Sequence, residues 1–406
     1  MVPWAGCSTE TLFQPDSLGG IAMRPLTGIK VIEMAGLAPA PYCGMILADF
    51  GADVVVVDRL SKGSQETPFF MSKDPLDRGK RSIRIDLKTE EGIAMVKRQI
   101  VSSDVLLEPY RPGVMEKLGI GPDDALKLNP KLIYARLTGW GQSGPYAGMA
   151  GHDINYLALS GVLSLCRLKG EKPHPPCNLL GDFAGGGMLC ALGITLALFE
   201  RTHSGKGQVV DAAMVDGASS FLTYIYGLLA HNFMTLDIGS NILDGAAPYY
   251  QTYETADQKY MAVGAIEGRF YEQFVLGLQL DPTSLPDQNE EEQWPKMQAQ
   301  FAEIFRNKTR DEWSAIFKGK DACVSPVLDL DEVDQDPHFI ERRSFINLKG
   351  TLQPAAAPRL TRTPGRSDTP GSPRGSETRK VLEDLGYSSE EISILLEKGI
   401  VEASLE

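Results

Sequence analysis

The chain has 406 residues, more than one ordinary compact domain holds, so the sequence predicts two domains with enough apolar residues for a core in each. Hydrophobic residues make up 43% and charged residues 23%, which is typical of globular proteins and excludes a wholly disordered, collagen-like or coiled-coil chain. The formal charge of −13, from 40 basic and 53 acidic side chains, disfavours a general nucleic-acid-binding protein, because such proteins need a basic surface.

The first half of the chain alternates predicted strands with predicted helices. The strands are expected at 29–33, 53–58, 82–86, 105–108, 132–137 and 208–211, and the helices at 39–50, 90–100 and 182–201. The nearly all-valine segment at 53–58 is typical of a parallel strand that is covered on both faces. This alternation predicts an α/β fold with a large, doubly wound, Rossmann-like parallel sheet over residues 26–220.

The second half is mixed and more acidic, and it predicts a smaller α+β domain over 225–335. Its expected elements are strands at 260–263 and 324–328 and helices at 269–276 and 295–305. Residues 353–380 are rich in Pro, Gly and Arg and predict an extended connector, after which Ser388 starts a helix. Residues 1–25 are left unassigned as an N-terminal extension, with Met23 a candidate start.

Signals for a membrane span, a metal site or a targeting address are weak. The longest apolar run, 185–199, is shorter than a bilayer requires and predicts a buried helix. Six cysteines are scattered without a C-x-x-C pattern, so we expect neither zinc nor a disulfide framework. Neither end of the chain carries a clear secretory, mitochondrial or peroxisomal signal.

The familiar nucleotide motifs are absent. The turn after the first predicted strand has the sequence MAGLAP at 34–39, which is not G-x-G-x-x-G. The one match to that string, at 139–144, is followed by Pro145 and by no helical pattern. The sequence therefore does not favour NAD binding, and it contains no Walker A loop and no G-x-S-x-G elbow.

One segment is basic against this acidic background. Between residues 59 and 88, eight basic residues against four acidic ones give a local charge of +4. The basic residues are Arg59, Lys62, Lys73, Arg78, Lys80, Arg81, Arg84 and Lys88. At the ends of sheet strands they would suit a ligand with several phosphates, such as a nucleotide or coenzyme A, whereas the alternative is a solvated surface loop.

Three residues are candidates for acid–base chemistry. His152 follows a Gly-rich loop and precedes an apolar helical stretch, although a structural histidine could occupy the same place. Asp182 starts the long predicted helix, either as its N-cap or as a functional carboxylate. The glycines at 185–187 predict a close approach to this helix turn, whose N–H groups could stabilise an oxyanion. Glu267 ends a strand of the small domain, where a solvated carboxylate is the alternative.

Around these candidates the sequence resembles the family III CoA-transferase superfamily, and within it the branch of racemases. The resemblance covers about residues 26 to 365. The matching segments are GLAPAP (36–41), ADFGAD (48–53), VDR (57–59), EPYRPGV (108–114), LIYARLTGWGQSG (132–144), GHDINY (151–156), NLLGDF (178–183), GKGQV (205–209) and AVGAIE (262–267).

The resemblance implies a large domain completed by residues 340–406, a small domain, and two interlocked subunits that share active sites. It implies an acyl-CoA thioester substrate, with coenzyme A part of the substrate and no separate cofactor or metal. Arg59 and Arg111, with Lys88 as a weaker candidate, are implied contacts of the CoA nucleotide. Further implied contacts, around the pantetheine and thioester, are Gly151, Asp153 and Tyr156.

The same resemblance implies the chemistry. His152 paired with Glu267 would be one acid–base group and Asp182 the other, facing each other across the α-carbon of a 2-methylacyl-CoA thioester. The N–H groups at Asp182 and the following helix turn would hold the enolate oxygen. Such enzymes work in peroxisomes and mitochondria, or in the bacterial cytoplasm, and an intracellular location is expected here.

Two other functions stay open. In transferases of the superfamily, the aspartate that matches Asp182 attacks the thioester as a nucleophile. His152 with Glu267 favours the racemase, because a nucleophilic transferase has no need of a second acid–base group. A non-catalytic acyl-CoA-binding protein is the remaining alternative, which the presence of all three candidates disfavours.

Overall fold

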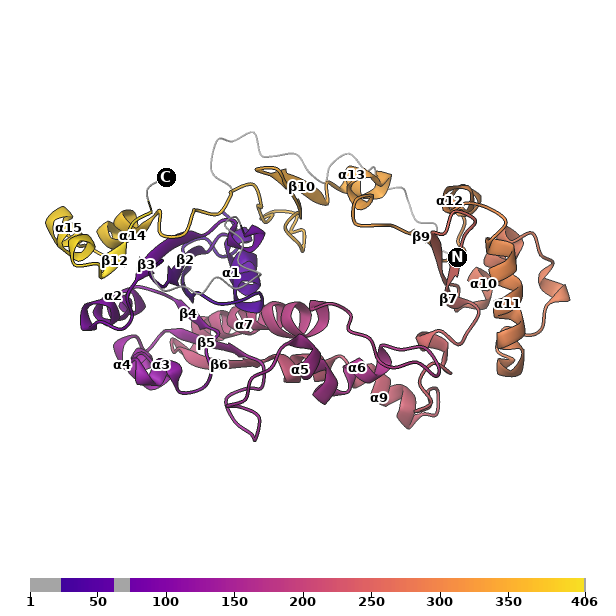
Figure 1. Ribbon diagram of the computed structural model, residues 1–406, viewed down its shortest axis with the longest axis horizontal. Coiled ribbons are helices and arrows are strands. Elements are labelled where there is room, and N and C mark those ends of the chain that lie inside the picture. Colours follow the sequence, from indigo (N-terminus) through magenta and orange to yellow (C-terminus); the bar gives the residue numbers. More distant parts are fainter. Residues whose placement is uncertain (1–22, 62–73, 405–406) are drawn as a thin grey trace. The chain divides into compact units, whose positions relative to one another are not determined.

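A computed structural model describes residues 23–61 and 74–404 of the chain (Figure 1). The chain divides into two compact units. The first unit is discontinuous and comprises the described parts of 1–156, 178–218 and 340–406, and the second comprises 157–177 and 219–339. Segments from both ends of the sequence therefore fold into the same unit.

The first unit is built on a seven-stranded sheet with the order β12-β3-β2-β1-β4-β5-β6. Neighbouring strands from β3 to β6 are parallel, and the edge strand β12 is antiparallel to β3. The strands are β1 (Lys30–Met34), β2 (Asp53–Asp58), β3 (Arg81–Ile85), β4 (Val105–Glu108), β5 (Ile133–Thr138), β6 (Gln208–Ala213) and β12 (Val401–Glu402). The six strands predicted for this half are thus confirmed, with bounds that agree within two residues.

Helices cover both faces of this sheet because its strands are apolar on both faces. Val31 and Val54 point into one core, whereas their neighbours Ile32 and Val55 point into the other. One core is completed by α1 (Pro39–Asp49) and α7 (Leu189–Ser204), and the other by α2 (Glu90–Val101), α14 (Thr378–Asp384) and α15 (Ser389–Glu397). The predicted α/β fold with a mainly parallel sheet is confirmed.

The strand order reverses at β1, which has β2 and β3 on one side and β4 to β6 on the other. In open α/β sheets, ligands bind at the carboxyl ends of the strands beside such a reversal. The loops that leave β1 and β4 touch there, since a Cβ on Gly36 would lie 2.4 Å from Cγ of Pro109. The topology therefore marks this edge of the sheet as the place for a site.

The predicted helix at 182–201 is longer and less regular than expected. A π-helical stretch, Leu179–Met188, comes first and continues directly into α7. Gly185, Gly186 and Gly187 are buried in it. The space beside these glycines is filled by neighbouring protein atoms and not by a ligand site. A Cβ on Gly185 would lie 2.8 Å from the N atom of Ala218, and one on Gly187 would lie 2.6 Å from the carbonyl oxygen of Pro39. Close helix packing thus explains these glycines.

Among the described residues, Leu179–Ser204 is the one helical stretch that is long and apolar enough to cross a membrane by length and composition. Its inner residues Cys190, Ile194 and Ala197 are buried in the core of the first unit. The core helices of globular proteins pass the same test. The prediction of a core helix is therefore confirmed.

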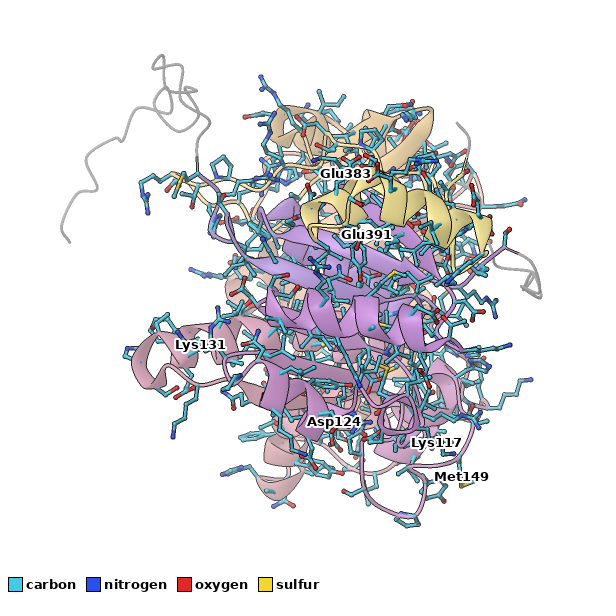
Figure 2. The ribbon with its side chains drawn as sticks, turned by 90° about the vertical axis from the view of Figure 1, so that its left-hand side faces the viewer. Lys117, Asp124, Lys131, Met149, Glu383 and Glu391 are labelled. Carbon is cyan, nitrogen blue, oxygen red and sulfur yellow. The ribbon has the colours of Figure 1, made fainter. Side chains whose placement is uncertain are left out.

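The C-terminal segment, yellow in Figure 1, is fixed to the sheet by ion pairs and by β12. Arg374 lies 2.9 Å from Asp58 at the end of β2, and Arg84 lies 2.6 Å from Glu402. A hairpin of β10 (Phe345–Leu348) and β11 (Thr351–Pro354) precedes this segment. Figure 2 shows charged side chains of α14 and α15, such as Glu383 and Glu391, on the outside of these two helices.

The second unit has an antiparallel sheet in the order β7-β8-β9, packed on helices by an aromatic core. Phe274, Phe301 and Phe305 are fully buried in that core. The strands are β7 (Tyr250–Glu254), β8 (Tyr260–Gly264) and β9 (Val324–Val327), and the helices are α10 (Gly268–Gly277), α11 (Trp294–Phe305) and α12 (Arg310–Phe317). The strands and helices predicted here are confirmed, but β7 and α12 were not predicted.

Shorter helices connect these elements. They are α3 (Val114–Lys117), α4 (Pro122–Leu128), α5 (Asp153–Ser160), α6 (Val162–Leu165), α8 (Met214–Ser220), α9 (Thr223–Ala230) and α13 (Pro337–Arg342). Single 3₁₀ turns lie at Pro75–Asp77, Ile242–Asp244, Pro282–Ser284, Glu291–Gln293 and Val333–Gln335.

Candidate active site

His152 lies directly before α5, at the end of the long loop that leaves the carboxyl end of β5. Its side chain is exposed, while its backbone is held by Asn155. The His152 N–H donates to Oδ1 of Asn155 at 3.0 Å, and its carbonyl accepts from the Asn155 N–H at 2.8 Å. The imidazole therefore projects from a fixed helix start.

Tyr156 and Trp140 support the loop behind His152. The Tyr156 ring is buried edge-on against Trp140, with 4.8 Å between ring centroids, and its hydroxyl donates to the carbonyl of Gly151 at 2.5 Å. A Cβ on Gly151 would lie 2.8 Å from the Tyr156 ring. Burial, with the charges of Asp182 and Asp153, raises the pKa of Tyr156 to about 12, so its hydroxyl stays a donor.

Asp182 lies within the π-helical stretch, half-buried, one turn after Asn178. Asn178 Nδ2 donates to Oδ2 of Asp182 at 3.2 Å. Burial raises the pKa of Asp182, and the negative charge of Asp153 raises it further, while the Asn178 bond and the charge of His152 oppose the shift. His152 and Asp182 are therefore close enough to interact electrostatically.

Asp182 is not the N-cap of its helix, because residue 178 occupies that position. Its N–H is also not open to an oxyanion, since it donates to Oδ2 of Asp153 at 2.8 Å. The expectation that this N–H holds the enolate oxygen is therefore wrong. Asn178 was not predicted from the sequence, although its place one helical turn before Asp182 could have indicated it.

Arg59 and Arg111 follow the carboxyl ends of β2 and β4, on the two sides of β1, and both side chains are exposed. Tyr110, in the loop after β4, packs against the core of the sheet, and its hydroxyl donates to the carbonyl of Ala35 at 3.2 Å. Burial raises the pKa of Tyr110 to about 12, and the positive charge of Arg59 opposes this shift. The charge of Arg111 has the same effect on Tyr156. The positive charges of Arg59 and Arg111 thus lie along the carboxyl edge of the sheet, the edge at which His152 also lies.

The rest of the basic stretch has a structural role instead. Arg78 pairs with Asp49 at 2.7 Å and Lys80 with Glu33 at 2.8 Å, and both basic side chains are buried. Arg81 and Arg84 also form ion pairs, and Lys62 and Lys73 lie outside the described residues. Within 23–61 and 74–404, Arg59 and Lys88 are the exposed members of this segment without an ion pair, so among its described residues these two are available for a phosphate.

Lys88 follows β3, two strands away from β1. Its side chain is exposed, and its N–H donates to Oδ1 of Asp86 at 3.0 Å. It is therefore farther along the sheet from the strand-order reversal than Arg59 is.

Glu267 belongs to the second unit. It follows β8 and occupies the N-cap position of α10, where its carbonyl accepts from the N–H groups of Phe270 and Tyr271 at 2.8 and 2.9 Å. Its carboxylate is exposed and does not cap the helix. The side chain is thus available for a contact outside its own helix.

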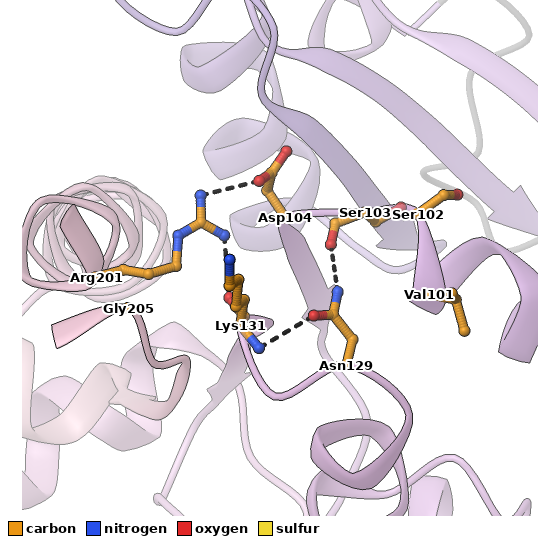
Figure 3. A pocket seen from close by; sticks show the side chains of 8 residues that line it. All are labelled: Val101, Ser102, Ser103, Asp104, Asn129, Lys131, Arg201 and Gly205. Atoms are coloured by element: carbon orange, nitrogen blue, oxygen red, sulfur yellow. Dashed lines mark hydrogen bonds and ion pairs between the residues drawn. The ribbon is translucent and has the colours of Figure 1, made fainter.

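A polar pocket of about 450 Å³ lies at the opposite, amino edge of the large sheet (Figure 3). Several of its polar side chains bond to one another or to backbone: Arg201 pairs with Asp104 at 2.9 Å, and Asn129 donates to the carbonyl of Ser103 at 2.7 Å. These bonds tie the end of α7 to the loops that enter β4 and β5. The polar side chains of this pocket therefore have a structural role.

Comparison with known proteins identifies the family of this chain. The sequence profile of CoA-transferase family III matches residues 26–378. The chain belongs to CoA-transferase family III. This member of the family is 51% identical to the alpha-methylacyl-CoA racemase of Mus musculus and 50% identical to that of Homo sapiens, over 93% of this chain and 98% of each relative. It is also 31% identical, with the same coverage, to the succinyl-CoA–D-citramalate CoA-transferase of Chloroflexus aurantiacus.

Solved structures of the same kind share the fold of this CoA-transferase family III member. A CAIB/BAIF family protein from Brucella suis superposes with a TM-score of 0.78 at 26% identity, covering 89% of this chain and 99% of its own. Rv3272 from M. tuberculosis gives a TM-score of 0.73 at 25% identity, covering 88% of this chain and 99% of its own.

Proposed function

We propose that this family III protein is an α-methylacyl-CoA racemase, an isomerase that inverts the α-carbon of 2-methylacyl-CoA thioesters. The observation that carries the proposal is the identity of 51% and 50% with two such racemases over nearly the whole chain. The positions of His152 and Asp182, at the carboxyl edge of the sheet and within electrostatic reach of each other, support it.

Inversion next to a thioester carbonyl requires proton removal on one face of the carbon and delivery on the other. For one enantiomer the Asp182 carboxylate takes the α-proton and the His152 imidazolium delivers one, and for the other enantiomer the roles reverse. The raised pKa of Asp182 brings its basicity closer to that of an imidazole. Proton transfer is then feasible in both directions.

The enolate oxygen needs fixed hydrogen-bond donors while negative charge develops on it. Because the Asp182 N–H is already bonded to Asp153, we assign this role to the N–H groups of Asp153 and Ile154, the first two of α5. The next N–H, that of Asn155, already donates to the carbonyl of His152. The first two groups have no partner inside their helix, and the helix dipole favours negative charge beside them. They directly follow His152, where the thioester must lie for the transfer.

Coenzyme A is proposed to lie along the carboxyl edge, with its phosphates at Arg59 and Arg111 and with Lys88 as an outer contact. Arginine suits phosphate because its guanidinium donates in a fork. Gly151, Asp153 and Tyr156 surround the thioester end, but the Tyr156 hydroxyl is already bonded to Gly151.

Glu267 is proposed to orient His152 and to come from the second unit of another copy of the chain, in a homodimer with shared sites. The exposed face of α7 supports a partner surface, because three large apolar side chains recur along it and a fourth lies directly before it. They are Met188, Leu192, Leu196 and Phe199, each at least half exposed.

The direct test starts from one pure enantiomer of a 2-methylacyl-CoA in heavy water. The wild-type protein should racemise it and incorporate deuterium at the α-position. His152→Ala and Asp182→Ala should each lower the racemisation rate by about 100-fold or more, because each removes one of two proton-transfer groups. Full activity of either variant would refute the assignment.

A family III CoA-transferase is the alternative, supported by the 31% identity with such an enzyme. In that reaction Asp182 would form a mixed anhydride with the acyl group and release CoA. Incubation with acyl-CoA and hydroxylamine would then convert Asp182 to a hydroxamate, and mass spectrometry would detect it. Saturable acyl-CoA binding with neither exchange nor hydroxamate would indicate a binding protein.

A further inference from the structure

Asp153 connects the two segments that carry the proposed acid–base residues. It is the first residue of α5, directly after His152, and its side chain is only 5% exposed. Its Oδ2 accepts from the N–H of Gly181 at 2.7 Å and from the N–H of Asp182 at 2.8 Å. One carboxylate oxygen thus links the start of α5 to the backbone of Asp182 itself.

The contact between Asp153 and Gly181 is too close to accept a side chain at residue 181. A Cβ on Gly181 would lie 2.6 Å from Oδ2 of Asp153 and 3.4 Å from its Cα. The two backbones can approach this closely because residue 181 is a glycine. The distance between His152 and Asp182 therefore depends on the pair of bonds that Asp153 accepts.

The second oxygen of Asp153 indicates that the negative charge itself has a role. Among the described residues, Oδ1 is buried and has no hydrogen-bond partner. Burying a carboxylate whose second oxygen is unsatisfied costs free energy, and such groups in native proteins call for an explanation. A neutral amide could accept the same two N–H bonds through one oxygen.

Electrostatics supplies that explanation. Asp153 faces Asp182 together with Asn178 and His152, and its charge raises the pKa of Asp182 while the other two lower it. Tyr156, which packs beside them, remains protonated at neutral pH. The buried charge thus strengthens Asp182 as a base, whereas the backbone bonds fix its position.

We infer that Asp153 is a positioning residue of the reaction, which sets the separation of His152 and Asp182 and places a fixed negative charge beside Asp182. The inference rests on the proposed racemase function. It assigns the carboxylate to the protein's own backbone and not to a contact with the pantetheine.

The experiment compares Asp153→Asn and Asp153→Ala with the wild type in the deuterium-exchange assay over a range of pH. Asp153→Asn keeps an acceptor but loses the charge, so the acid limb of its kcat profile should move to lower pH. Asp153→Ala loses both, and its kcat should fall by about 100-fold with KM little changed, because misplacement by about 1 Å costs that much.

Asp49→Asn is the matched control, because Asp49 is an equally buried carboxylate at the far end of α1, bonded to Arg78. It should lower the melting temperature while leaving kcat and the pH profile of the folded protein unchanged. Should Asp153→Ala fail to fold, the pH profile of Asp153→Asn decides.

Two outcomes would overturn the inference: an Asp153→Asn profile that coincides with that of the wild type, or an Asp153→Ala variant with wild-type kcat. A rise in KM alone would also overturn it, because that result would indicate a substrate contact. If the wild type itself exchanged no α-proton, the proposed function would fail instead.

Discussion

At the scale of single residues, the site depends on side chains that are buried and already bonded to protein. The Tyr156 hydroxyl holds the backbone of Gly151, directly before His152, and the Asp153 carboxylate holds the backbone at Asp182; both side chains are buried. The exposed side chain of His152 projects from this support. Chemistry and support are thus divided between neighbouring residues.

Tyr156→Phe tests this division. Loss of the hydrogen bond to Gly151 should destabilise the protein by about 1 kcal/mol and should lower kcat about fivefold, with KM for acyl-CoA unchanged. Tyr134→Phe is the control, since Tyr134 is buried and donates to the carbonyl of Ile120 at 3.0 Å, away from the site. It should cost similar stability and no activity. A higher KM in Tyr156→Phe would indicate a pantetheine contact instead.

Glu33 makes stability depend on pH. Burial raises its pKa from 4.5 to about 7 despite the neighbouring Lys80, so the folded state keeps a proton that the unfolded chain has lost. The contribution of Glu33 to the free energy of unfolding is therefore full below about pH 4.5 and is lost as the pH rises through about 7.

Glu33→Gln should remove this slope, which amounts to at most about 1.4 kcal/mol per pH unit inside that window. Urea unfolding of wild type and variant at several pH values would measure it. Glu91→Gln, at an exposed helix position, should keep the wild-type slope. Parallel curves for wild type and Glu33→Gln would contradict the expectation.

At the scale of elements, the π-helical stretch decides where Asp182 lies. Such helices are rare, and they are frequent at functional sites. This one packs against α1 and α8 through backbone contacts that require glycine. Tyr42 of α1 also lies edge-on against Phe183, next to Asp182, with ring centroids 5.0 Å apart. Packing therefore fixes the position of the carboxylate.

Gly187→Ala should disturb this packing, because its Cβ would lie 2.6 Å from the carbonyl oxygen of Pro39 and 2.9 Å from the Tyr42 ring. We expect a loss of about 1–3 kcal/mol in the free energy of unfolding and a lower kcat. Gly227→Ala, in α9 with open space around it, should instead stabilise by up to about 1 kcal/mol. Wild-type kcat in Gly187→Ala would show that the stretch tolerates displacement.

The sequence predicted the strands of the large sheet well because runs such as 53–58 are apolar throughout and are bounded by turn residues. It missed β12, a strand of two residues whose pairing with β3 joins positions far apart in the chain. The bond between Asp153 and Asp182 was also not predictable, because it depends on tertiary packing. His152, Asp182 and Glu267 stood out in the sequence as candidates, but their roles came from the resemblance, since no local pattern distinguishes a catalytic from a structural role at these positions.

At the scale of the whole molecule, two features of the first unit are consistent with the proposed dimer. The apolar side chains along α7 are exposed, and β6 is an edge strand of the sheet that the described residues form. Glu267, proposed to orient His152, lies in the other unit. A closed twofold dimer would bury the same surface of both copies and complete two sites at once.

Mixing two inactive variants tests this arrangement. His152→Ala and Glu267→Ala should each be nearly inactive alone, but a heterodimer with shared sites contains one site with both residues intact. Unfolding and refolding an equal mixture makes about half of the dimers heterodimers, so activity should return to about one quarter of the wild-type value.

Leu192→Lys with Leu196→Lys provides the control, because charges on the exposed face of α7 should prevent the dimer from forming. When both inactive variants carry this double change, sedimentation should show monomers, and mixing should restore no activity. Recovery that fails in the original mixture, despite heterodimers detected by mass, would place His152 and Glu267 of one site on the same chain.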